Sequence, residues 1–102
     1  MYAICEALPR PPIRLRASDV TSTTVRLKWM SANAEPVESY VLRYKRKGTD
    51  EAYKEVIDIT GTEYPLMHLG ANSIYEVHVL AVNSIGRSLP GASVEVATRE
   101  AG

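Results

Sequence analysis

The 102-residue sequence predicts an all-β domain, specifically a seven-stranded antiparallel Greek-key β-sandwich. Three observations support this prediction. Apolar and polar residues alternate in seven short segments, none of which has a helical period. Turn residues separate these segments at the spacing of a sandwich. Finally, Tyr75 opens a long alternating segment and Leu69 stands six residues upstream, which is the form of a tyrosine corner.

The first three strands are predicted from regular alternation of side chains. The proline-rich stretch 9–12 is stiff and extended, so we expect it to mark the start of the domain. Strands are then expected at 13–18, 25–29 and 40–45, with a loop at 30–36 between the second and the third. The residues expected to face inward are Ile13, Leu15, Ala17, Val25, Leu27, Trp29, Tyr40, Leu42 and Tyr44.

The last four strands are separated by clear turn signals. A turn at 48–50 precedes a less regular strand at 53–59, and residues 61–62 end it. The short strand 63–66 contains Pro65, which cannot donate a hydrogen bond in a central strand. The longest strand, 73–83, follows the tyrosine corner. The strand 88–98 closes the domain with Val94 and Val96 facing inward, and Pro90 and Gly91 predict a kink or bulge at its start.

The composition argues against several functions. The formal net charge is zero, so we expect neither nucleic acid nor an anionic membrane as a partner, and no apolar stretch could insert into a bilayer. Cys5 is the only cysteine, which excludes an internal disulfide, and its role stays open. His68 and His78 are expected to be separate surface imidazoles and not metal ligands. Because no catalytic constellation and no phosphate loop are present, we expect neither catalysis nor a cofactor.

Four cations on the first predicted hairpin form one candidate contact surface. If the connection is centred near residues 20–22, Arg16 lies opposite Arg26, and Arg14 lies opposite Lys28. Like charges in these positions would destabilise the sheet, which suggests a polyanion such as heparan sulfate or an acidic neighbouring domain as a partner. The favoured alternative is a solvated face on which Glu63 or Glu95 lies near the cations.

A second candidate contact surface lies on the other sheet. Alternation places one side of the long strand outward, beside the outward side of the third strand. A small exposed apolar patch with a charged rim is the hypothesis, and scattered surface apolar residues are the alternative. Substitution of Leu80 by Asp is then expected to disturb binding but not folding. The candidate contact residues are Val41, Arg43, Lys45, His78, Leu80, Val82 and Ile85, the last at an exposed turn tip.

The combined motifs resemble a fibronectin type III domain over about residues 9–99. Residues 1–8 are then expected to be a linker or a flexible N-terminal arm, and residues 100–102 a flexible tail. The resemblance implies structural roles for Trp29, Tyr40, Leu69 and Tyr75. Ala71 departs from the pattern, because many members of the family have proline there. The residues that support the resemblance are Pro12, Trp29, Tyr40-x-Leu42-x-Tyr44, the Leu69 and Tyr75 corner, and Ala81-Val-Asn-Ser-x-Gly86.

A narrower resemblance is to the ectodomains of leukocyte-common-antigen-related receptor tyrosine phosphatases, through the segments 7–12, 35–40 and 81–87. It implies a non-catalytic interaction and spacer module in the extracellular part of a plasma-membrane receptor. Immunoglobulin-like or fibronectin type III domains of the same chain would be its neighbours, and its protein ligand is unknown. Alternatives are an intracellular scaffold or muscle module in the cytoplasm and an engineered binding scaffold. We expect the chain to be one domain of a larger protein or a cytosolic protein.

Overall fold

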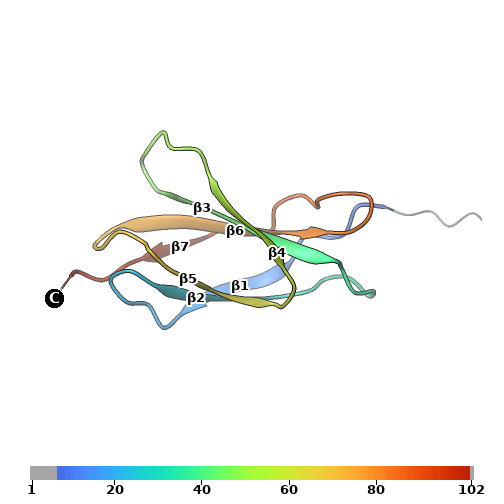
Figure 1. The fold of residues 1–102 in the computed structure, drawn as a ribbon, viewed down its shortest axis with the longest axis horizontal. Helices are drawn as coiled ribbons and strands as arrows, with labels where there is room; N and C mark the ends of the chain where they lie inside the picture. Colours follow the sequence, from blue (N-terminus) through green and yellow to red (C-terminus); the bar gives the residue numbers. More distant parts are fainter. Residues whose placement is uncertain (1–6, 102) are drawn as a thin grey trace, which may run out of the picture.

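Seven strands and no helix make up residues 7–101, the part of the chain that a computed structural model describes (Figure 1). Within this part, therefore, no helix is long and apolar enough to span a membrane. The strands are β1 (Ile13–Ser18), β2 (Val25–Met30), β3 (Ser39–Arg46), β4 (Lys54–Ile59), β5 (Glu63–Leu66), β6 (Ile74–Val82) and β7 (Val94–Ala97).

The strands form two antiparallel sheets packed face to face. The three-stranded sheet has the order β1-β2-β5, and the four-stranded sheet has the order β4-β3-β6-β7. The chain crosses from one sheet to the other after β2, β4 and β5, which is the predicted Greek-key sandwich. The last strand is shorter than expected. Before β7, the N–H groups of Ser88 and Gly91 donate to carbonyls of β6 at 2.8 and 3.0 Å without forming a regular ladder, since Pro90 has no N–H to donate.

The core lies between the inner faces of the two sheets, and the predicted alternation accounts for most of it. In the edge strand β1 the prediction is wrong for Ile13 and Ala17, which are exposed. The side chains of Leu27 and Leu42 are fully buried, and burial of each contributes roughly 1.5–3 kcal/mol. Trp29 and Tyr40 face each other from opposite sheets in an edge-to-face contact, with ring centroids 5.5 Å apart. The buried cluster comprises Val25, Leu27, Trp29, Tyr40, Leu42, Ile59, Leu66, Leu69, Tyr75, Val77, Val79, Ala81 and Val96.

The tyrosine corner joins the two sheets. The hydroxyl oxygen of Tyr75 accepts a hydrogen bond from the backbone N–H of Gly70 at 2.7 Å, and the guanidinium of Arg46 lies 5.8 Å from the ring centroid. The side chain of Leu69 is buried, and its N–H donates to the carbonyl of Thr23 at 2.9 Å. The corner therefore ties the start of β6 to the turn between β1 and β2.

Two edge strands are interrupted by β-bulges. Arg14 in β1 and Asp58 in β4 have φ values of 57° and 59°, and the pairing register shifts beside each of them. A left-handed residue bends an edge strand and breaks the row of free N–H and C=O groups. The bulges therefore protect one edge of each sheet against pairing with another chain.

The two ends of the described chain lie at opposite ends of the long axis (Figure 1). Pro9 and Pro12 are buried near the start, whereas Ala7 and Leu8 are exposed. Cys5 and most of the arm predicted at 1–8 lie outside the described residues. The division into 1–8, 9–99 and 100–102 therefore stays a prediction.

Candidate interaction surfaces

The structure corrects the predicted pairing of cations on the outer face of the three-stranded sheet. Arg16 pairs with Lys28, Ser18 pairs with Arg26, and Arg14 lies in the bulge. The predicted register is wrong by two residues because the turn is centred one residue later than expected. Hydrogen bonds around the side chain of Thr21 close that turn.

Two of these four cations have acidic partners, as the solvated-face alternative expects. Atom Nη1 of Arg26 lies 3.5 Å from Glu63 Oε1, and its Nε lies 3.7 Å from a carboxylate oxygen of Asp19. The ammonium of Lys28 lies 3.9 Å from Glu63 Oε2. Such exposed pairs contribute about 0–1 kcal/mol each. A polyanion bound here would have to displace Glu63, so the geometry favours the solvated face.

The prediction of an exposed apolar patch on the four-stranded sheet is wrong. Val41, His78 and Leu80 do point away from the core, but only 2%, 6% and 6% of their surfaces are exposed. Alternation tells which side of a sheet a residue occupies but not whether another segment covers that side. The ring of Tyr53, which precedes β4, covers part of this face and meets the His78 ring edge-to-face with centroids 4.8 Å apart.

Tyr53 is the centre of an aromatic and charged cluster that sequence analysis missed. The guanidinium carbon of Arg43 lies 4.7 Å from its ring centroid, and the ammonium of Lys45 lies 5.2 Å from it. The Tyr53 hydroxyl donates to Oε2 of Glu76 at 3.3 Å. Two cations from β3 and one anion from β6 therefore hold the ring in one position.

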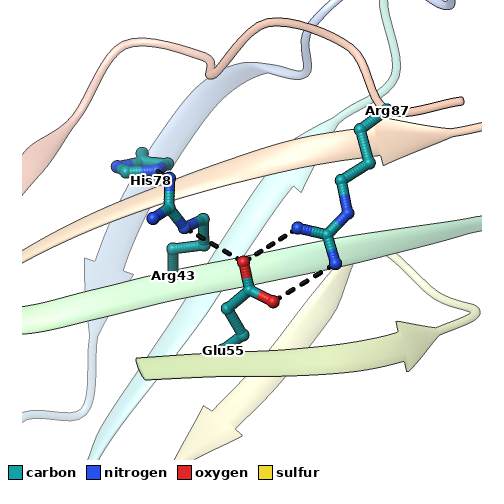
Figure 2. Close-up of polar contacts among 4 residues, drawn as sticks. All are labelled: Arg43, Glu55, His78 and Arg87. Atoms are coloured by element: carbon teal, nitrogen blue, oxygen red, sulfur yellow. Dashed lines mark hydrogen bonds and ion pairs between the residues drawn. The ribbon is translucent and has the colours of Figure 1, made fainter. Parts of the chain in front are cut away.

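Glu55 joins three segments on the same face (Figure 2). Both of its carboxylate oxygens accept hydrogen bonds from the Arg87 guanidinium, at 2.8 and 3.2 Å. The Nε atom of Arg43 lies 3.2 Å from Oε2 of Glu55, an ion pair without hydrogen-bond geometry. The hydrogen bond from Arg87 holds the pKa of Glu55 below its ordinary value, and the charge of Arg43 acts in the same direction. Bidentate Arg–carboxylate pairs have a defined geometry, so this part of the face is pre-organised.

The surroundings of His78 favour the neutral imidazole. Burial is the largest cause of a lowered pKa at His78, and the positive charge of Arg43 lowers it further. Atom Nη1 of Arg43 lies 3.5 Å from the Nε2 atom of His78, at the limit of a hydrogen bond (Figure 2). Glu76 acts in the opposite direction but does not outweigh burial. Among residues 7–101, no group of three or more His, Cys, Asp or Glu side chains is placed to hold a metal ion.

A third surface lies at the end of the sandwich where the chain enters. Ile85 is 49% exposed at the tip of its turn, as expected from the sequence. Gly86 has a φ of 155°, a backbone conformation that glycine adopts without steric cost. The Oδ1 atom of Asn83 accepts hydrogen bonds from the N–H groups of Ile85 and Gly86 at 2.9 and 3.2 Å. Asparagine is common at the start of such a turn, so this role of Asn83 could be read from the sequence. Asn83 also donates a hydrogen bond to the carbonyl of Ala7, and no sequence pattern indicates that contact.

Two comparisons with known proteins agree on the family. Residues 10–97 match the family described as the fibronectin type III domain. The chain is 44% identical to mouse receptor-type tyrosine-protein phosphatase F over 95 residues, which is 93% of this chain and 5% of that protein. It is 37% identical to Drosophila melanogaster tyrosine-protein phosphatase Lar over the same shares of each chain. The chain thus spans only about 5% of the length of these relatives.

A solved structure supports the fold independently of sequence. The crystal structure of chicken CNTN1 FN1–FN3 domains superimposes with a TM-score of 0.80. The match covers 90% of this chain and 32% of that one, at 24% identity. At this level of identity the similarity supports the sandwich architecture only.

Proposed function

The chain belongs to the fibronectin type III family, and from this premise we propose that it is a spacer and protein-interaction module in the extracellular part of a plasma-membrane receptor. Fibronectin type III domains are non-catalytic. Function therefore has to come from the position of the domain in a larger chain and from its surface.

The identity to receptor-type tyrosine phosphatases supports a receptor as the parent protein. The aligned region, at 37–44% identity to these relatives, extends over 93% of the chain. An intracellular scaffold or muscle module and an engineered scaffold share the fold, but a shared fold alone does not favour them. Any phosphatase activity of the parent would belong to parts outside this domain.

The single observation that most supports the spacer role is the position of the two ends. Because the described chain enters at one end of the long axis and leaves at the other, domains joined in series would lie in line (Figure 1). Buried Pro9 and Pro12 stiffen the entering segment. The partners favoured by this arrangement are immunoglobulin-like or fibronectin type III domains of the same polypeptide.

The outer face of the four-stranded sheet is the surface that we propose for contact with a protein. Arg43, Tyr53 and Arg87 are of the residue types that dominate binding energies in interfaces. Their side chains are already held by Glu55, Glu76 and each other, so binding would cost little side-chain entropy. Because Glu55 already pairs with Arg43 and Arg87, this face offers a partner an aromatic ring among paired charges and not a free cationic patch.

Domain replacement in the full-length receptor separates the two roles. One variant carries a fibronectin type III domain of similar length but low identity in place of residues 9–99, and a second carries Tyr53→Ala and Arg87→Ala in the native domain. If the domain is only a spacer, ligand binding by the receptor survives both changes. If the outer face contacts the ligand, binding weakens at least about tenfold in both, since 1.4 kcal/mol corresponds to a factor of ten. Loss of binding after replacement but not in the double variant would remove the outer face from the proposal.

A further inference from the structure

Two asparagines hold the entering chain against the end of the sandwich. The Nδ2 group of Asn83 donates to the carbonyl of Ala7 at 2.8 Å. The side chain of Asn33 bonds the backbone of Arg10 twice: its Oδ1 accepts from the N–H at 2.8 Å, and its Nδ2 donates to the carbonyl at 3.0 Å. Because the asparagines come from the loops after β2 and β6, the segment 7–10 is fixed from both sheets.

Each asparagine is itself positioned by its own loop. The N–H of Asn33 donates to the hydroxyl of Ser31 at 3.1 Å. The Oδ1 atom of Asn83 accepts from two N–H groups of the turn at 85–86, which leaves its Nδ2 group aimed at the arm. The two side chains therefore pay little conformational entropy when they bind the arm.

Apolar packing along the same path supports the polar contacts. Pro9 and Pro12 are buried. A Cβ atom at Gly86 would lie 3.3 Å from Cδ2 of Leu8, and one at Gly91 would lie only 2.6 Å from the carbonyl oxygen of Pro12. The segment between β6 and β7 thus lies close to residues 8–12, which pack against the sandwich.

A groove of about 580 Å³ opens beside the arm. Its apolar lining includes Leu8, Pro36 and Val37, and among the described residues that line it only Glu35 and Glu38 are charged. Leu8 is 53% exposed beside this groove. An occupant that matches these walls presents an apolar side chain with a cation next to it.

We propose that Asn33 and Asn83 form a clamp that sets the direction of the entering chain, and that the groove receives the domain preceding this one in the same polypeptide. This inference rests on the proposed spacer function. The clamp holds Ala7 at the rim, so a domain joined through residues 1–6 would begin within about 20 Å of the groove. Residues 1–6 themselves, Met-Tyr-Ala-Ile-Cys-Glu, carry no lysine or arginine and do not match an acidic groove.

The clamp is tested first in the single domain. Amide order parameters of Ala7, Leu8 and Arg10 should be near about 0.85 in the native chain and below about 0.6 in the variant Asn33→Ala/Asn83→Asp. Aspartate keeps the acceptor that closes the turn but removes the donor. Asn72→Gly is the matched control, because Asn72 has a φ of 49° that glycine tolerates, and that variant should leave the arm rigid. An arm as ordered in the clamp variant as in the native chain overturns the clamp.

The docking surface is tested in a two-domain fragment that includes the native preceding domain. Rotational correlation times should show one body in the native fragment and two independent bodies in the clamp variant and in Glu35→Lys/Glu38→Lys. Unchanged tumbling in both variants would overturn this inference but not the proposed spacer function, because the fragment would still be rigid. Independent tumbling of the native fragment would contradict the spacer function as well. Contacts from Tyr2 or Ile4 to Val37 in the single domain would show that the arm itself fills the groove, which also overturns the inference.

Discussion

Removal of the Tyr75 hydroxyl should destabilise the domain without disturbing its packing. In Tyr75→Phe the ring stays in the core, where the native residue is only 8% exposed, and no cavity of side-chain size is created. The loss is the acceptor of the hydrogen bond from the N–H of Gly70 at 2.7 Å. Because this hydrogen bond is only partly buried, its loss should cost about 0.5–1.5 kcal/mol, the net contribution of a typical hydrogen bond. For a domain of this length, each kcal/mol lowers Tm by about 4–8 °C.

Urea denaturation measures this cost directly, with the midpoint shifted and the slope unchanged. Tyr44→Phe is the matched control. Its ring centroid lies 6.4 Å from that of Tyr75, but its hydroxyl makes no hydrogen bond to another residue in 7–101. The control should lose less than about 0.5 kcal/mol. Equal free energies of unfolding for the two variants would refute the reasoning, because the corner would then contribute nothing beyond ring burial.

Three further predictions concern stability. Leu80→Asp should unfold or strongly destabilise the domain, by about 3 kcal/mol or more, because it buries an unpaired charge; a circular-dichroism melt like that of the native protein would contradict the burial of this face. Gly91→Ala should cost about 1–3 kcal/mol in chemical denaturation, since its Cβ would lie 2.6 Å from a backbone carbonyl oxygen, whereas Gly61→Ala meets nothing within 4 Å and should be near neutral. Burial lowers the pKa of His78 in the folded state, so the unfolded chain takes up the proton at a higher pH than the folded chain. The free energy of unfolding should therefore fall as the pH drops below about 6.5. His78→Gln should remove that part of the pH dependence, whereas a His68→Gln control should retain it.

Most core residues could be predicted from the sequence, because the apolar residues of an alternating strand face the core. Val25, Leu27 and Trp29 face a closed core whose only requirement is apolar packing. The corner was also predictable, since its hydrogen bond joins Gly70 and Tyr75, which are only five residues apart in the sequence. The family resemblance drew on the same residues.

Burial on the outer face of the four-stranded sheet could not be predicted, because the residues that cover this face are distant in the sequence. His78 and Leu80 were expected to be exposed, but whether Tyr53 lies over this face depends on how the hairpin between β3 and β4 folds back. The contact of Glu55 with Arg87 joins residues 32 positions apart, and no local pattern indicates it. The predicted pairing register of β1 and β2 was wrong for a related reason. The alternation of apolar and polar residues shows neither the bulge at Arg14 nor the centre of the following turn.

The central claim is that this domain acts mainly through its geometry, as a stiff element that fixes the spacing of its neighbours. The most direct measurement is the distance distribution between two spin labels, one in each flanking domain of the full ectodomain, by pulsed electron paramagnetic resonance. A single narrow distribution, centred near the length expected for domains in line, is the predicted result. A broad distribution that extends to short distances would contradict the claim, since the joints and not the domain would then set the spacing.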